Sequence, residues 1–140
     1  MSIDDLDNVY ELEVRSYNYP WTKEILRDCI LYNYDSYSVF FEDMLIGYII
    51  AKISYPESHI LNLTVNNDFR NNGIGLSLVE LAINDAKIRK SSDIILEVRS
   101  SNFIAQHLYK KLNFEKIGTR KDYYKSDFGR EDAFIFKLKL

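Results

Sequence analysis

The sequence predicts a single domain of the α/β or α+β class, with a mixed central sheet of about six to seven strands flanked by about four helices. Two observations predict this class. The middle of the chain reads as strand, glycine-containing turn, helix, strand and helix, which is the order of a parallel β-α-β unit. The 140 residues are 46% hydrophobic and 28% charged, so the chain can bury a core of ordinary size. We therefore treat residues 1–140 as one domain.

Two helices are expected at the start of the chain. Apolar residues recur at helical spacing over residues 2–15. Pro20 keeps Tyr19 out of the helical conformation and so separates this segment from the next. Thr22 can then cap a second helix. The apolar residues of this second helix recur at helical spacing and are Ile25, Leu26, Cys29 and Ile30.

Three strands are expected next. Residues 37–41 and 45–53 flank a tight connection at Glu42-Asp43, and this pattern predicts a hairpin. Residues 59–65 alternate between two sets of side chains, which predicts a third strand.

The second half of the chain completes the β-α-β unit. A polar stretch over residues 66–72 leads to Gly73 and Gly75, and a long helix follows with apolar residues at spacings of three and four. The remaining expected elements are a strand over 93–98, a helix over 101–112 and two strands from Phe114 onward.

Composition and charge exclude several classes of protein. Lys and Arg number 18 against 21 Asp and Glu, and the net charge of −3 gives no global attraction to nucleic acid or anionic lipid. The longest apolar run, residues 44–51, is too short to span a membrane, and the acidic start of the chain does not match a secretory signal. The single Cys29 suits a reducing compartment and is expected to be buried and inert. We expect a cytoplasmic protein without nucleic-acid or membrane partners.

The glycine turn is the first feature that indicates a ligand. A turn that opens a long helix presents unpaired backbone N–H groups, which favour a phosphate or diphosphate. Gly73 and Gly75 have no side chain to block close approach of such a group. A tight turn without a ligand is the alternative. A Walker loop is excluded because no Gly-Lys-Ser/Thr follows, and a dinucleotide fingerprint is weak because Leu78 stands where a third glycine is needed.

Glu97 is the second candidate functional residue. It interrupts an apolar strand, where a carboxylate is costly unless it is paired, and burial there would make it a useful base. The alternative is a solvent-facing Glu97 that pairs with Arg99. His59 and His107 have no partner at the spacing of metal ligands, so no metal site is expected.

Tyr109 is the third candidate. It falls at the edge of an apolar arc on the predicted helix, where the ring can pack while the hydroxyl reaches a cleft. A half-buried tyrosine without a chemical role is the alternative. Asn102, near the start of this helix, is suited to cap it. The arc consists of Ile104, Ala105, Leu108 and Leu112.

A resemblance to a known family singles out these residues. Arg70-Asn71-Asn72-Gly73-Ile74-Gly75 resembles the R/Q-x-x-G-x-G/A motif of the GNAT acetyltransferases. The chain as a whole resembles the bacterial ribosomal-protein-alanine N-acetyltransferases, the RimI type. Asn66-Asn67 departs from the usual Asp-Pro, and Asn113 departs from the usual glycine, although asparagine tolerates the left-handed backbone needed there. Further segments that carry the resemblance are 19–21, 96–99, 101–102, 105, 108–109, 112, 114 and 129–133.

The resemblance implies an acetyltransferase that uses acetyl-coenzyme A (acetyl-CoA) as co-substrate, without a metal. Glu97 then corresponds to the general base, and Tyr109 to the acid that protonates the departing thiolate. Tyr123-Tyr124 are expected between the last two strands, where related enzymes hold the start of the peptide. The implied cofactor-binding residues are Leu63, Thr64 and Val65 for the pantetheine arm, Asn71, Asn72, Gly73, Ile74, Gly75 and Leu76 for the diphosphate, and Asn102.

The implied substrate is the N-terminal alanine of the eighteenth small-subunit ribosomal protein. The partner is then the N-terminal peptide of a ribosomal protein, and the enzyme itself is expected to be a monomer or a weak dimer. Two alternatives remain open. One is acetylation of a small-molecule amine such as a polyamine or an aminoglycoside, and the other is a non-catalytic module that binds acyl-CoA.

Overall fold

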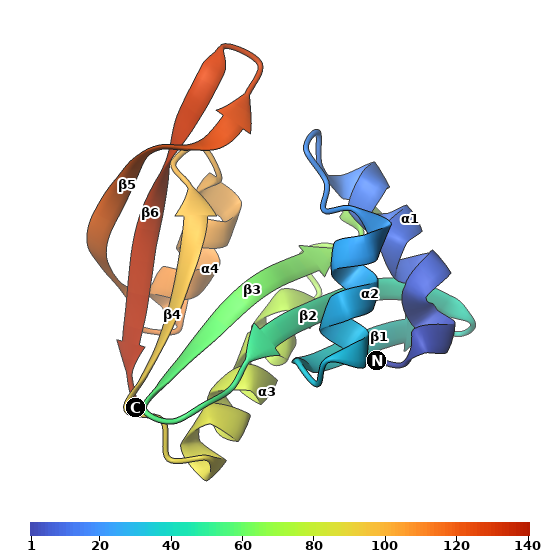
Figure 1. Ribbon diagram of the computed structural model, residues 1–140, viewed down its shortest axis with the longest axis horizontal. Helices are drawn as coiled ribbons and strands as arrows, with labels where there is room; N and C mark the ends of the chain where they lie inside the picture. Colours follow the sequence, from blue (N-terminus) through green and yellow to red (C-terminus); the bar gives the residue numbers. More distant parts are fainter. The chain divides into compact units, whose positions relative to one another are not determined.

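The computed structural model describes residues 1–140, and its six strands form one mixed sheet in the order β1-β2-β3-β4-β6-β5 (Figure 1). This arrangement, with four α-helices, confirms the predicted fold class. The helices are α1 (Leu6–Ser16), α2 (Lys23–Leu31), α3 (Ile74–Ile88) and α4 (Phe103–Lys111), with short 3₁₀ turns at Ile3–Asp5 and Asn67–Phe69. The strands are β1 (Asp35–Phe41), β2 (Met44–Lys52), β3 (Glu57–Val65), β4 (Asp93–Arg99), β5 (Glu115–Ser126) and β6 (Gly129–Lys139).

The chain divides into two compact units. Unit 1 comprises Met1–Lys52 and Leu61–Ala82, and unit 2 comprises Ile53–Ile60 and Ile83–Leu140. The expected β-α-β unit is present, since β3 and β4 are parallel and α3 connects them in sequence. None of the helices is long and apolar enough to cross a membrane.

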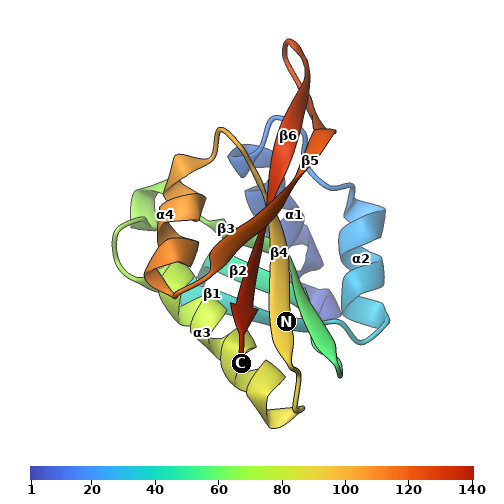
Figure 2. The ribbon, with the colours of Figure 1, turned by 90° about the vertical axis from the view of Figure 1, so that its left-hand side faces the viewer.

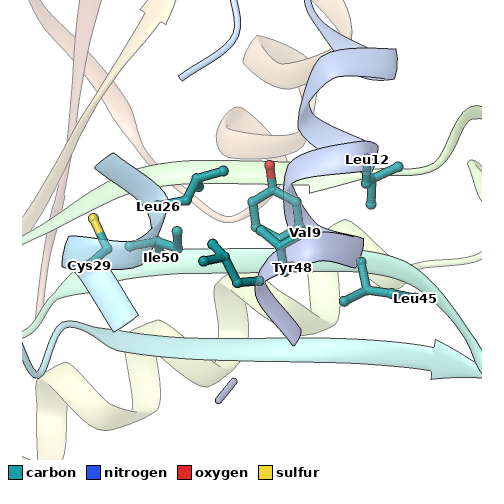
Figure 3. Packing of buried hydrophobic residues seen from close by; sticks show 8 residues of the cluster. Val9, Leu12, Leu26, Cys29, Leu45, Tyr48 and Ile50 are labelled. Atoms are coloured by element: carbon teal, nitrogen blue, oxygen red, sulfur yellow. The ribbon is translucent and has the colours of Figure 1, made fainter. Parts of the chain in front are cut away.

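In unit 1, α1 and α2 cover one face of β2. The Thr22 hydroxyl accepts a hydrogen bond from the N–H of Ile25 (3.2 Å) and caps α2, as the sequence predicts. Apolar side chains of both helices meet those of β2 in one buried cluster (Figure 3). Its labelled members are Val9, Leu12, Leu26, Cys29, Leu45, Tyr48 and Ile50.

The start of α3 covers the other face of β2. A Cβ atom on Gly47 would lie 3.2 Å from the carbonyl oxygen of Thr64 and 3.3 Å from the side chain of Ile74, so glycine lets β2, β3 and α3 approach closely. Seven consecutive residues of β2 are buried because both of its faces are covered.

In unit 2, β4 buries one face and leaves the other partly open. Its residues alternate between buried and half-buried, with Leu96 on the covered face. Tyr109 of α4 packs there, with its ring centroid 5.7 Å from Phe114 and 6.3 Å from Phe136. Glu97 lies on the other, partly open face.

The predicted apolar arc of α4 is wrong in part, since Ala105, Leu108 and Leu112 are half-buried but Ile104 is not. Ile104 is 69% exposed, whereas Tyr109 and Gln106 are the buried side chains of the helix. Gln106 fits the buried face because its side-chain amide donates to the carbonyls of Arg99 (3.1 Å) and Ser100 (3.0 Å). The hydrogen bonds of Gln106 to the preceding loop and the packing of the Tyr109 ring together define the face that α4 buries.

Candidate functional site

The turn before α3 has a left-handed backbone at two positions. Gly73 has a φ of 76°, in the left-handed region, and no atom lies within 4 Å of the position that a Cβ would take. Asn71 is also left-handed, with a φ of 65°. The side chain of Asn72 donates to the carbonyl oxygens of Phe69 (3.0 Å) and Arg70 (3.3 Å) and so holds the turn in place.

The N-terminus of α3 offers donors to an anion. The first helical hydrogen bond here runs from the N–H of Ser77 to the carbonyl of Gly73 (3.0 Å), so the N–H groups of Ile74, Gly75 and Leu76 have no acceptor within the helix. No acidic side chain occupies the first turn to compete for them. These three N–H groups at the positive end of a 15-residue helix fit a diphosphate.

Residues 63–65 of β3 also lie in unit 1, but two of them already have partners. The hydroxyl of Tyr17 donates to the carbonyl of Leu63 (2.7 Å) and lies 2.9 Å from Oγ1 of Thr64. Burial raises the pKa of Tyr17 to about 12, so the hydroxyl stays protonated at neutral pH. Val65 is half-buried at the end of the strand.

A buried carboxylate, Glu13, organises the same region, and the sequence patterns above did not single it out. Its side chain accepts hydrogen bonds from the N–H of Trp21 (2.9 Å), from the amide of Asn62 (2.9 Å) and from the hydroxyl of Tyr48. Glu13 is 2% exposed. The sequence does contain a signal for it, because Glu13 stands four residues after Val9 on the buried face of α1.

Glu97 of β4, in unit 2, is held by two donors. Its side chain is 13% exposed, and a carboxylate oxygen lies 3.3 Å from Nε of Arg120. The hydroxyl of Tyr123 donates to the same carboxylate, which raises the pKa of Tyr123. The predicted alternative, a pair between Glu97 and Arg99, is wrong, because Arg99 forms its ion pair with Glu131 (3.1 Å).

A bulge in β5 brings both donors to Glu97. The β5–β6 register shifts between Arg120 and Tyr124, and Asp122 within this segment has a left-handed φ of 52°. Figure 2 shows β5 and β6 continuing past the end of β4. Tyr123 and Tyr124 therefore lie inside β5, and the prediction that they lie between the last two strands is wrong.

Tyr109 and Asn102 lie at the two ends of α4. Tyr109 is 6% exposed, so its ring is part of the unit 2 core rather than at the edge of an apolar arc. Asn102 caps α4, since its side-chain oxygen accepts from the N–H of Ala105 (3.1 Å), as predicted. Unit 2 thus holds Glu97, Tyr109 and Asn102, while unit 1 holds residues 63–65 and 71–76.

Two further features of the structure lie apart from these residues. An open groove of about 590 Å³ in unit 1 contains none of the predicted site residues; it is lined by Asn8, Glu11, Leu12, Arg15, Phe41, Glu42, Asp43, Met44, Leu45 and Phe69. No group of three or more His, Cys, Asp or Glu side chains is arranged to hold a metal ion.

Replacing Gly73 by alanine tests the turn. A left-handed backbone costs an alanine about 1–2 kcal/mol, and open space around the new Cβ means that this strain acts alone. We expect urea unfolding to show that Gly73→Ala lowers the free energy of unfolding by this amount. Gly118→Ala is the matched control, because its Cβ would make only an ordinary contact with Ile135 at 3.6 Å. Equal losses of stability for the two variants would contradict the left-handed strain expected at residue 73.

Cys29 is expected to be chemically inert. Its side chain is buried, and burial, reinforced by Asp28, raises the pKa of the thiol to about 11. Only roughly one thiol in a thousand is then ionised at pH 8. Alkylation by iodoacetamide at pH 8 should be slow in the native protein and fast in guanidinium chloride. Rapid labelling of the native protein would show that the Cys29 thiol is accessible and reactive.

Comparison with known proteins identifies the family. The chain matches the acetyltransferase (GNAT) family over residues 6–114. A Bacillus subtilis relative, provisionally assigned as a ribosomal protein bS18-alanine N-acetyltransferase, is 38% identical over 142 residues, covering 100% of this chain and 93% of its own. The ribosomal protein bS18-alanine N-acetyltransferase of Haemophilus ducreyi is 34% identical over 137 residues, covering 97% and 94%. The crystal structure of the ribosomal-protein-S18-alanine N-acetyltransferase from Escherichia coli matches with a TM-score of 0.91 at 29% identity, covering 99% of this chain and 90% of that one.

The chain therefore belongs to the GNAT acetyltransferase family. Enzymes of this family use acetyl-CoA. Within the family, this acetyltransferase is related to the ribosomal protein bS18-alanine N-acetyltransferases.

Proposed function

We propose that the protein acetylates the α-amine of an N-terminal alanine, with the eighteenth small-subunit ribosomal protein as substrate. The names of its full-length relatives support this substrate. The observation that carries the enzymatic proposal is the half-buried Glu97 carboxylate, held on the partly open face of β4 by Arg120 and Tyr123. The family match extends over parts of both units, which supports residues 1–140 as one N-acetyltransferase domain.

Acetyl-CoA supplies an activated thioester to this reaction. We propose that the N–H groups around residues 71–76 hold its diphosphate, that Leu63, Thr64 and Val65 pair with its pantetheine arm, and that Asn102 adds a hydrogen bond. The carbonyl of Leu63 already accepts from Tyr17, so the backbone N–H groups of this segment are the groups proposed to contact the arm. An activated thioester needs no metal to react with an amine.

Glu97 takes the proton of the attacking amine in this proposal, directly or through a water molecule, and Tyr109 donates a proton to the departing thiolate. The α-amine of a peptide has a pKa near 8, whereas a lysine side chain has a pKa near 10.4. Deprotonating the lysine therefore costs roughly 3 kcal/mol more at neutral pH. A peptide N-terminus is the easier acceptor for a single carboxylate base.

Three outcomes of one assay separate this function from its alternatives. The purified chain is incubated with acetyl-CoA and, in turn, an alanine-starting peptide, the same peptide with a blocked N-terminus and an internal lysine, spermidine, and an aminoglycoside. Release of free coenzyme A and the mass of each acceptor are measured. Acetylation of the alanine-starting peptide alone supports the proposal. Acetylation of only the small amines supports the first alternative, and binding of acetyl-CoA without any transfer supports a binding module.

A further inference from the structure

His59 of β3 and Glu97 of β4 lie on the same face of unit 2. The two strands pair in parallel with His59 opposite Ile95, and Glu97 is two residues beyond Ile95. Side chains two residues apart in a strand point to the same face. His59 is half-buried, as Glu97 is, so neither side chain belongs to the covered core of the unit.

The carboxylate of Glu97 is already bound to two other side chains. The guanidinium of Arg120 and the hydroxyl of Tyr123 both stabilise its charged form. The imidazole of His59 lies on the neighbouring strand, and imidazole has the basicity that suits proton transfer near neutral pH.

The charges around His59 come from three strands. Burial lowers its pKa, Glu97 of β4 and Glu57 of β3 raise it, and Arg120 of β5 lowers it, with burial the largest of these effects. Lys137 of β6 lies opposite Ile95 in the sheet register and is bound to Asp93 at 3.2 Å. His59 is therefore neutral at pH 7, with Glu97 the main charge that favours its protonation.

We infer that His59 is a second proton-accepting residue of the acetyl transfer and works as a pair with Glu97. This inference rests on the proposed function. The α-ammonium loses two protons in the reaction, and Glu97 takes the first, which frees the amine for attack, and passes it to solvent. As the amine nitrogen bonds to the acetyl carbon and the bond from that carbon to sulfur breaks, the second proton passes to the imidazole of His59. The carboxylate of Glu97 stabilises the imidazolium that forms. Coenzyme A leaves as the thiolate, which Tyr109 protonates as in the proposed function.

The pairing can be measured without any activity. The chain contains two histidines, so imidazole NMR resonances are assigned with a single variant, His107→Gln. His59 should titrate below 6.5 in the wild type. Glu97→Gln should lower its midpoint further and Arg120→Gln should raise it, because the first change removes an attractive charge and the second a repulsive one. An unchanged midpoint in both variants would overturn the pairing.

The catalytic part is tested by the pH profile of kcat/KM for an alanine-starting peptide. We expect His59→Gln to lower kcat/KM at pH 7 by about tenfold to a hundredfold and to remove an acid limb with a midpoint below 6.5. His59→Asn is the second variant if the first folds poorly, and His107→Gln is the control, since His107 is exposed on α4. An active enzyme whose profile is unchanged by His59→Gln overturns the inference alone. Absence of transfer by the wild type to any acceptor overturns the proposed function, while the NMR titration still tests the pair.

Discussion

Glu97→Gln is expected to lower turnover by on the order of a hundredfold or more at neutral pH. The amide keeps the shape of the carboxylate and can still accept the hydrogen bond from Tyr123, but it cannot take a proton. Loss of the ion pair with Arg120 should affect folding little, because the Arg120 side chain is 54% exposed. The turnover is measured as kcat with an alanine-starting peptide. The affinity for coenzyme A is measured by calorimetry, and this affinity should stay nearly unchanged.

Asp93→Asn is the matched control for this substitution. Asp93 lies on the same strand and face, has a similarly buried side chain (19% exposed against 13%) and also forms an ion pair, with Lys137 at 3.2 Å. Its change from acid to amide should alter turnover only a few-fold. If Glu97→Gln retained turnover close to that of the wild type, the assignment of Glu97 as a base would be wrong.

Local patterns in the sequence predict most of the fold. The two-residue turn at Glu42-Asp43, the Thr22 cap and the helix that begins after Gly73 all depend on neighbouring residues, and each is present in the structure. Asn113 has a left-handed φ of 70° at the end of α4, as expected for asparagine in place of glycine. Such features depend on a few consecutive residues, so a single sequence is enough to predict them.

The partners of the candidate site residues depend on pairing between distant segments. Arg120 and Tyr123 reach Glu97 only because β5 carries a bulge and pairs with β6, which in turn pairs with β4. A register shift has no simple signature in the sequence. The buried face of α4 was mispredicted for a similar reason, because Gln106 is buried by hydrogen bonds to a loop that apolar periodicity does not describe.

Glu13→Ala should destabilise the protein by at least about 3 kcal/mol, since it leaves three buried or half-buried donors without their acceptor. These donors are the Trp21 N–H, the Asn62 amide and the Tyr48 hydroxyl, which connect the segment after α1 with β2 and β3. A loss of this size is a large part of the stability of an ordinary domain. Urea unfolding measures it, with Glu11→Ala as the control, because Glu11 is exposed on the same helix and should change stability by less than about 0.5 kcal/mol.

Glu13→Gln separates the charge of this residue from its shape. Glutamine keeps an oxygen that can accept two of the three hydrogen bonds, but its NH₂ group faces the third donor. We therefore expect a loss of stability between those of Glu11→Ala and Glu13→Ala. The same network fixes the partners of the Tyr17 hydroxyl, because Thr64 donates to Asn62 (2.9 Å) and lies 2.9 Å from that hydroxyl. A weaker network should therefore also loosen Leu63, whose carbonyl accepts the hydrogen bond from Tyr17. We expect this change to raise the KM for acetyl-CoA more than it lowers kcat. A Glu13→Gln variant as stable as the wild type, with an unchanged KM, would show that the carboxylate does not organise this segment.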